Sequence, residues 1–381
     1  MLRPRRPVEG IRPDRFKPSH CPWRDCRGHT EARIVRWVRV GSYRRAADPR
    51  RRVPRYRCSE CRRTCSRQSF ACTYYLKRPE LLQPIAAMLI AGSAHRQIAR
   101  TLGCAPSTVT RLAARIGRHS LLLQALALGE LDSLEEPIVF DHFETFVFSQ
   151  DDRLGIGTAV GQRSWFVYTM DPAPHARAGK RSVRRRKRKL PLPAKIPRSV
   201  VRSTERVLRL LGLLGRGRVD VVSDDHPLYP VAVATQKQLE IRHRVYPNPP
   251  RGADLTTAAR ERDREMFAAD LLHKLWRHSQ AHQRRETIAC GRRSNAVLER
   301  SALMMVWRNF VKGVSERRAD RTTPAQRLGL TEQAFRWRDI FARRLFPGRI
   351  PLPEGWSSIY RREWITPAVG RNLRHDLKQA F

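Results

Sequence analysis

The fold is decided by residues 138–170, which read IVFDHFETFVFSQDDRLGIGTAVGQRSWFVYTM. Three runs within this stretch, 138–148, 153–161 and 163–170, are rich in β-branched and aromatic residues, and polar or glycine-containing turns separate them. Short runs of this composition divided by turn residues predict successive strands of an antiparallel meander. We therefore expect a β-sheet to begin here.

Helices and strands alternate after this stretch. The sequence predicts a helix over 200–214, a buried strand over 218–225 that ends in acids, a short helix over 226–236 and a further strand over 239–247. The resulting order is three strands, helix, strand, helix, strand and helix. It predicts a mixed sheet with helices outside it, within a multidomain α/β protein.

Carboxylates are scarce in this chain, which has 35 Asp and Glu against 76 Lys and Arg. Asp141 lies within the first strand, where burial of a charge is costly unless a cation compensates it, and Asp224 ends the strand over 218–225. If these strands are neighbours, the two carboxylates converge, and a hard divalent cation such as Mg²⁺ would relieve their repulsion. With a third acid they could hold two metal ions about 4 Å apart for phosphoryl transfer. Taken singly, each Asp is more often a strand-end acid in a local salt bridge.

The residues before the meander have helical periodicity. Apolar residues at helical spacing predict a helix over 80–91 and a short helix over 95–102, and Gly103 ends the second one. We place Ser107 as the N-cap of a third helix. The buried stripe of this third helix consists of Val109, Leu112 and Ile116.

The spacing of Ala99, Gly103 and Val109 is the one that a helix-turn-helix needs, because the small residue lets the helices approach and the glycine makes the turn. The alternative is an ordinary helical hairpin with a solvated basic face. The side chains expected on the outside, where they suit phosphates and base edges, are Ser107, Thr108, Thr110, Arg111, Arg115 and Arg118.

The cysteines crowd near the start of the chain. MLRPRRPVEG, the first ten residues, contains no apolar signal segment, so we expect no export and reduced thiols. Two close pairs suit a closed tetrahedral zinc site of structural rather than catalytic type, and β-rich residues between the pairs suit a zinc ribbon. The expected ligands are Cys21, Cys26, Cys58 and Cys61. Cys65 or Cys72 could replace a member of this set, and scattered buried thiols are the alternative.

Several of these motifs resemble one family. The segments CPWRDC, YRCSECRRTC, HRQIARTLGCAPSTVTRLAARIG, DHFE and SDDHPLY, in this order, look like the transposases of bacterial insertion sequences in which a zinc ribbon and a helix-turn-helix precede a ribonuclease H-like DD(E/D/N) domain. The resemblance covers about residues 20–330. It implies DNA transposition with Mg²⁺ or Mn²⁺, with Asp141 as the first catalytic acid and Asp224 as the second.

The third acid is expected on a helix, followed seven residues later by Arg. Asp270 fits this expectation, with Arg277 seven residues on, although the usual Glu of the family is Asp here. Glu286 is the runner-up, and Glu265 and Glu299 come behind it.

The resemblance implies a division into units. We expect a zinc ribbon over 15–76, a helix-turn-helix over 77–130, a ribonuclease H-like catalytic domain over 131–315 with a basic insertion over 174–199, and a basic C-terminal extension over 316–381. The extension contains aromatic residues that would either clamp DNA or pack against the protein: Trp356, Tyr360 and Trp364.

The net charge of +41 favours a polyanionic partner, most commonly a nucleic acid, with acidic proteins and anionic membrane surfaces as alternatives. The expected partner is double-stranded DNA, both the transposon ends and the target, and no membrane is expected, because no apolar run approaches the length of a bilayer span. We expect a homodimer or higher oligomer in a cytoplasmic, nucleoid-associated setting. The alternatives are a catalytically inactive DNA-binding regulator and a ribonuclease H-like nuclease.

Overall fold

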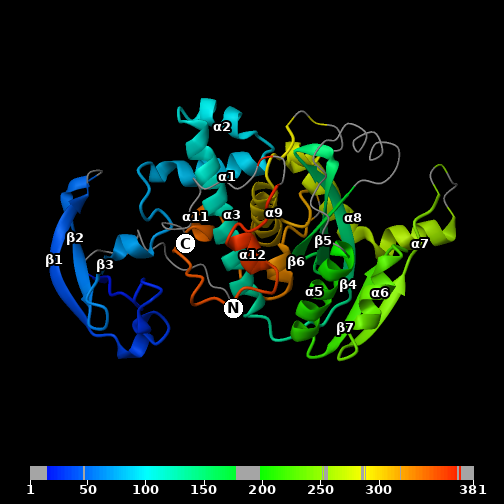
Figure 1. The fold of residues 1–381 in the computed structure, drawn as a ribbon, viewed down its shortest axis with the longest axis horizontal. Helices are drawn as coiled ribbons and strands as arrows, with labels where there is room; N and C mark the ends of the chain where they lie inside the picture. Colours follow the sequence, from blue (N-terminus) through cyan, green and yellow to red (C-terminus); the bar gives the residue numbers. More distant parts are fainter. Residues whose placement is uncertain are drawn as a thin grey trace.

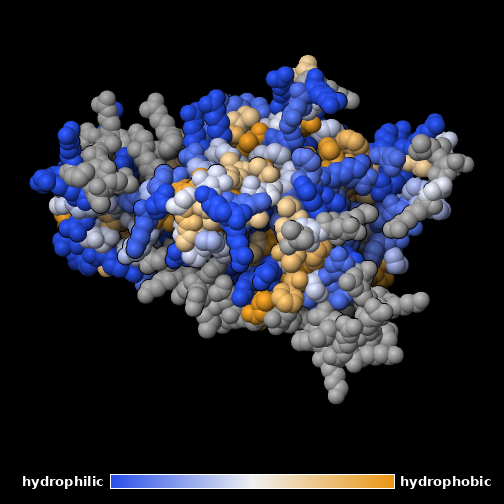
Figure 2. Space-filling model, turned by 90° about the horizontal axis from the view of Figure 1, so that it is seen from above, coloured by the Kyte–Doolittle hydropathy of each residue, from blue (hydrophilic) through white to orange (hydrophobic). Residues whose placement is uncertain are grey.

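The computed structural model describes residues 15–45, 48–176, 198–250, 252, 256–284, 287, 289–317, 319–366 and 369. These residues form a mixed α/β protein with a small three-stranded antiparallel sheet, a five-stranded mixed sheet and helices between and around them (Figure 1). Hydrophilic residues dominate the face seen in Figure 2, and apolar residues occur there in small groups. No helix among the described residues has the length and apolar character needed to cross a membrane. The predicted basic insertion lies mostly outside the described residues.

The small sheet lies at one end of the molecule, drawn in blue in Figure 1. Two short 3₁₀ turns, η3 (Arg27–His29) and η4 (Ala32–Ile34), precede it. Its strands pair antiparallel in the order β1, β2, β3, and they span Trp37–Arg45, Asp48–Cys58 and Thr64–Ser66. A further 3₁₀ turn, η5 (Arg67–Phe70), leads out of the sheet.

Three helices follow, after the short turn η6 (Pro79–Leu81), and they match the predicted ones. They are α1 (Leu82–Ile90), α2 (His95–Thr101) and α3 (Pro106–Leu128). The predicted stripe of α3 is confirmed, since Val109, Leu112 and Ile116 are all buried.

The predicted N-cap of α3 is wrong. Ala105 is the N-cap, with extended φ and ψ of −70° and 142°, and Ser107 lies inside the first turn. Pro106 explains the earlier start, because its fixed φ suits the first helical position and its missing N–H is one that the helix would leave unbonded there.

The five-stranded sheet confirms the predicted order of elements. Its strand order is β6-β5-β4-β7-β8; β4, β5 and β6 are antiparallel, whereas β7 runs parallel to β4 and β8 runs parallel to β7. The strands are β4 (Ile138–Val147), β5 (Ser149–Gly161), β6 (Val167–Ala176), β7 (Arg218–Ser223) and β8 (Glu240–Val245). The helices after β6 are α5 (Ser199–Leu214), α6 (Leu228–Thr235), α7 (Thr257–Glu265) and α8 (Phe267–Ser279), and the turn η7 (Ala281–Gln283) follows.

Helices α5 and α8 cover opposite faces of this sheet. A Cβ at Gly157 of β5 would contact the Ser203 hydroxyl of α5 at 3.0 Å, whereas the next residue, Thr158, bonds His273 of α8 at 2.9 Å. Successive residues of a strand point to opposite faces, so the two helices lie on opposite sides. This arrangement covers the central strands with helices on both faces.

The chain after η7 joins the helical unit to the sheet. It contains α9 (Ser294–Val306), the π-helical segment η8 (Trp307–Val311), α10 (Pro324–Arg327), α11 (Trp337–Ile340) and α12 (Trp356–Tyr360). Helix α9 packs along α3, and Asn309 bonds both Gln124 of α3 and the backbone of Val167 in β6. Of the aromatic residues predicted to clamp DNA or to pack, Trp356 is fully buried and donates to the Met170 carbonyl at 2.9 Å, so it packs.

Gly117 sits at the closest approach of α3 to α9. A Cβ at this position would overlap the backbone carbonyl of Glu299. We expect Gly117→Ala to lower the free energy of unfolding by about 1–3 kcal/mol despite the higher helix propensity of Ala, because the two backbones must move apart. Urea denaturation followed by circular dichroism measures this loss.

The matched control is Gly129→Ala, at the C-cap of the same helix, where φ is −73° and the nearest atom to the added Cβ would be 3.5 Å away. This variant is expected to stay within about 0.5 kcal/mol of the parent. Equal losses in the two variants would contradict the close packing of α3 on α9.

Candidate functional site

Four of the cysteines form one tight group. The sulfur atoms of Cys21, Cys26, Cys58 and Cys61 all lie within 4.8 Å of one another, and this confirms the predicted grouping. The first pair lies on a turn closed by the Cys26 N–H bond to the Trp23 carbonyl, and the second lies on the turn that ends β2. Two turns from separate parts of the chain therefore bring the four thiols together.

The geometry of this cysteine group fits a single metal ion. Cys21 and Cys61 have their sulfurs 3.6 Å apart, and the sulfurs of Cys26 and Cys58 are 3.8 Å apart. These separations are far longer than the S–S bond of a disulfide, about 2.05 Å. They match the edge of about 3.8 Å in a tetrahedron of sulfurs around a metal bound at about 2.3 Å. The group could hold one structural metal ion.

Cys65 and Cys72, left open by the sequence, lie outside the group. Cys65 of β3 is buried in an aromatic cluster with Phe16, Phe70 and Phe346. Cys72 is buried elsewhere and donates to the backbone carbonyl of Arg343 at 3.0 Å. Neither replaces a member of the set.

The two predicted strand acids are brought together by the parallel pairing of β4 with β7. Phe140 pairs with Ser223, so Asp141 and Asp224 each follow directly after this pair. Their proximity has an electrostatic effect, because the charge of Asp224 and that of Asp270 both favour the protonated form of Asp141. Together with burial, which is the largest cause, they raise the pKa of Asp141 to about 8.

The groups that contact the Asp141 carboxyl are uncharged. Its Oδ1 accepts from the His142 backbone N–H at 2.7 Å and from the Tyr229 hydroxyl at 3.4 Å, and its Oδ2 lies 3.4 Å from Nδ1 of His273. Burial lowers the pKa of both histidines to about 3, so neither ring carries a charge at neutral pH. Since these side chains supply no positive charge, the raised pKa keeps Asp141 largely protonated at neutral pH unless a cation binds beside it.

The other two acids are held from different elements. Asp224 accepts from the Asn248 amide at 2.9 Å and from the His226 backbone N–H at 3.2 Å. Asp270, in the first turn of α8, forms an ion pair with Arg262 of α7. A metal ion at the acids would have to compete with this guanidinium for the Asp270 carboxylate.

The three aspartates form a looser group than the cysteines. Within the described part of the chain, the cysteines are the one set of three or more His, Cys, Asp or Glu whose donor atoms all lie within 4.8 Å of each other. The acids nevertheless provide hard oxygen donors of like charge in a partly buried position, and this donor chemistry fits a hard divalent cation. Side-chain exposure is 20% for Asp141 and 26% for Asp270.

The runners-up for the third acid do not join this group in the described structure. Glu299 of α9 is buried against α3, and it pairs with Arg362 at 2.9 Å. Glu265 bonds Gln162 at 2.8 Å and pairs with Arg244. Glu286 lies outside the described residues.

Two residues near the acids were not predicted from the sequence. Tyr229 and Arg262 contact Asp141 and Asp270, respectively. Tyr229 follows Asp224 by five residues, so its position just after β7 could have indicated that it lies near the acids. Arg262 precedes Asp270 by eight residues, but the bend between α7 and α8 hides this relation in the sequence.

The residues predicted to contact DNA divide into two sets. Ser107 and Arg111 are exposed, and Thr108 and Thr110 are partly buried. Thr110 donates to the Pro106 carbonyl at 3.0 Å and also bonds His95 of α2 at 3.0 Å.

The predicted exposure of Arg115 and Arg118 is wrong. Both are buried, with 6% and 5% of their surface exposed. Arg115 donates to the Tyr74 carbonyl at 2.8 Å, and Arg118 lies 3.9 Å from the Glu299 carboxylate. The reason is that α3 continues for 23 residues into the protein, where α9 and α12 cover its later turns.

No protein-family model matches this sequence, and no curated protein shows significant similarity to it.

The cysteine group predicts a metal dependence that can be measured. We expect the purified protein to contain about one equivalent of bound metal per chain and Cys58→Ser to lose it, because a tetrahedral site cannot close with three thiolates. Metal analysis by mass spectrometry measures the content, and a lowered melting temperature is expected to accompany its loss.

Cys104→Ser is the matched control, because Cys104 is partly buried and lies outside the group. It should keep the metal. Retention of a full equivalent by Cys58→Ser would refute the assignment.

Proposed function

We propose that this protein is a DNA transposase that binds the ends of an insertion sequence and cuts and joins DNA strands in a metal-dependent reaction. The observation that carries the proposal is the convergence of Asp141, Asp224 and Asp270 from two neighbouring parallel strands and a helix. Acids gathered in this way, in a chain with a net charge of +41, are suited to phosphoryl transfer on a nucleic acid.

The order of elements supports a ribonuclease H-like catalytic domain. A meander of three antiparallel strands is followed by two parallel strands that helices connect. In open sheets of this kind, ligands bind beyond the carboxyl ends of the parallel strands. Asp224 lies just past that end of β7, in agreement with a catalytic role.

Two kinds of metal belong to this proposal. Asp141, Asp224 and Asp270 would hold Mg²⁺ or Mn²⁺, which would activate the attacking oxygen and stabilise the leaving oxygen. Cys21, Cys26, Cys58 and Cys61 would hold a structural Zn²⁺ in a zinc ribbon, because four thiolates leave no open coordination position for catalysis.

The residues around Asp141 would act by fixing its carboxylate. The His142 backbone N–H and the Tyr229 hydroxyl hold Oδ1, and the His273 ring, itself bonded to Thr158, faces Oδ2. Arg262 would be the natural counter-charge of Asp270 before DNA and metal bind. Its release from Asp270 would leave a cation beside the phosphate that reacts.

Helices α2 and α3 would form the helix-turn-helix that recognises the element ends. Gly103 lies between them with a φ of +56°, a conformation that favours glycine in a tight turn. Ser107 and Arg111 are exposed on the first turns of α3, which is the part of a recognition helix that reaches base edges. Pairing of two ends would require a dimer or higher oligomer.

The catalytic assignment predicts a separation of cleavage from binding. We expect Asp141→Asn and Asp224→Asn to reduce Mg²⁺-dependent nicking of DNA that bears the element ends by at least about a hundredfold, because a metal ligand is lost. Binding of the same DNA should change little. Nicking is measured on a supercoiled plasmid and binding by fluorescence anisotropy.

Asp132→Asn is the matched control, since Asp132 is exposed and lies in the connection between α3 and β4, before the strand that carries Asp141. It should nick at the parental rate. Unchanged nicking by Asp141→Asn would refute the catalytic assignment. If the parent protein binds the element ends but does not nick them, an inactive DNA-binding regulator is favoured.

Two arginines of α3 are expected to have different roles, because Arg111 is exposed and Arg115 is buried. We expect Arg111→Ala to weaken end binding and to reduce the slope of log affinity against log salt by about 1, because one phosphate contact is lost. Arg115→Ala should instead lower the melting temperature, because its buried bond to the Tyr74 carbonyl is removed. An unchanged salt slope for Arg111→Ala would remove α3 from the DNA interface.

A further inference from the structure

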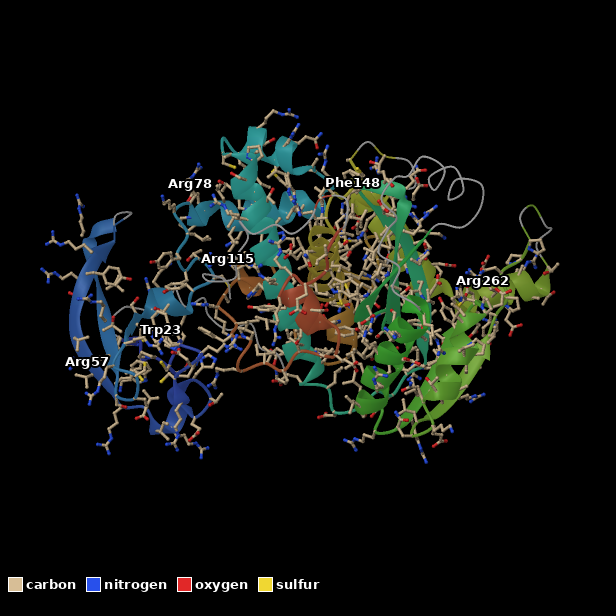
Figure 3. All side chains as sticks on the ribbon, in the orientation of Figure 1. Trp23, Arg57, Arg78, Arg115, Phe148 and Arg262 are labelled. Carbon is tan, nitrogen blue, oxygen red and sulfur yellow. The ribbon has the colours of Figure 1, made fainter. Side chains whose placement is uncertain are left out.

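A cavity of about 700 Å³ lies away from the acids, between the cysteine-bearing unit and the C-terminal part of the chain. Three separate segments line it, around residues 22–29, 69–75 and 344–361. In Figure 3, Trp23 lies on the side of the small sheet that faces the central helices. The volume of the cavity falls within the range of small-molecule sites, about 300–1,000 Å³.

The cavity wall is positively charged. Arg24, Arg344 and Arg361 line it. Among the described residues of the wall, Asp25 is the one carboxylate, and it is already paired with Arg63 at 2.7 Å. The exposed side chains of Arg24 and Arg361 therefore favour an anion at this cavity.

The cavity wall also offers aromatic surfaces. Trp23, Tyr74 and Tyr75 contribute rings, and the centroids of the two tyrosines are 5.3 Å apart. Tyr75 is 69% exposed although it is a large ring, and its φ of +63° is one that non-glycine residues rarely adopt. A ring held out in this way can stack on another flat π-system.

Buried polar atoms without a partner belong to the same wall. Within the described structure, Trp23 Nε1, His29 Nε2 and the Tyr360 hydroxyl have no hydrogen-bond partner. His29 and Tyr360 are at least nine-tenths buried, at 2% and 6% exposure. His29 bonds the Cys21 carbonyl through Nδ1 at 2.8 Å, so Nδ1 is the donor and Nε2 is left as an acceptor. The residues of the wall therefore hold unused donors and an unused acceptor just beneath the cavity surface.

We propose that this cavity binds one unpaired nucleotide of a DNA strand, at a strand end or flipped out of the duplex. The base would stack on Tyr75 and Trp23, its polar edge would meet the unpartnered atoms of His29 and Tyr360, and its phosphate would lie against Arg361. The combination of stacking, edge bonding and a phosphate contact is how proteins hold single unstacked nucleotides. This inference rests on DNA being the partner, as proposed above.

The test compares two DNA probes with the full-length protein. One is a blunt duplex that carries the element end, and the other is the same duplex with a single unpaired 2-aminopurine nucleotide. We expect the second to bind about tenfold more tightly and its 2-aminopurine fluorescence to change on binding, because the base enters an aromatic site. Tyr75→Ala and Arg361→Ala should abolish this preference and leave the affinity for the blunt duplex nearly unchanged.

The chain offers matched controls. Phe148 is also an exposed aromatic residue at positive φ, with 41% exposure and a φ of +66°, and Arg57 is an exposed arginine of β2. Both residues are labelled in Figure 3 and neither lines the cavity. Phe148→Ala and Arg57→Ala should keep the preference. Melting temperatures verify that all four variants are folded.

The outcomes separate this proposal from the proposed function. Equal affinity for the two probes, with blunt-duplex binding and nicking intact, would overturn the nucleotide site and leave the transposase proposal standing. If free dAMP binds but the two probes have equal affinity, the cavity is a site for free nucleotides. This result would also overturn the proposal of a site for a nucleotide of a DNA strand. Loss of the preference in Arg57→Ala or Phe148→Ala would show that charge or aromatic surface in general, and not this cavity, is responsible, and would overturn the proposal.

Discussion

The parallel pairing of β4 with β7 is the interaction on which the candidate site depends. Only three residue pairs form this ladder, from Ile138 with Val221 to Phe140 with Ser223, yet they fix where the acids after them lie. The pairing is sequence-distant, and the burial of both strands between helices stabilises it. Because the two strands run parallel, Asp141 within β4 and Asp224 just past the end of β7 lie at the same level of the sheet.

Helix α3 connects this sheet to the part of the chain proposed to read DNA. Its first turns are exposed and its later turns are packed under α9, so one helix of 23 residues belongs to both a surface and a core. The close approach at Gly117 and the bonds of Asn309 to α3 and β6 keep the two parts in contact. Because α3 passes from the surface into the core, Arg111 is exposed whereas Arg115 and Arg118 are buried.

The basic residues behind the net charge of +41 have different roles. Some arginines are structural, such as Arg206, which pairs with buried Asp171 at 2.5 Å, and Arg300, which donates to the Ser93 carbonyl. Others stay exposed on α3 and around the cavity between the cysteine unit and α12. The net charge therefore overstates the positive charge that the surface offers to a polyanion.

The sequence by itself determined the order of the strands and helices, the two close cysteine pairs and the places of Asp141 and Asp224 on or after strands, because periodicity, spacing and composition are local properties. The structure decided that these strands are neighbours and that Cys65 and Cys72 lie outside the cysteine group. The sequence did not determine the burial of Arg115 and Arg118, the pairing of Arg262 with Asp270, or the cavity beside Trp23. The burial of the two arginines and the cavity depend on segments far apart in the chain, as does the bond between His119 and Ile340, which are 221 positions apart. The pairing of Arg262 with Asp270 depends instead on the bend between α7 and α8. Only tertiary packing decides which polar side chains lose contact with water, since a helix face has the same sequence pattern whether solvent or another helix covers it.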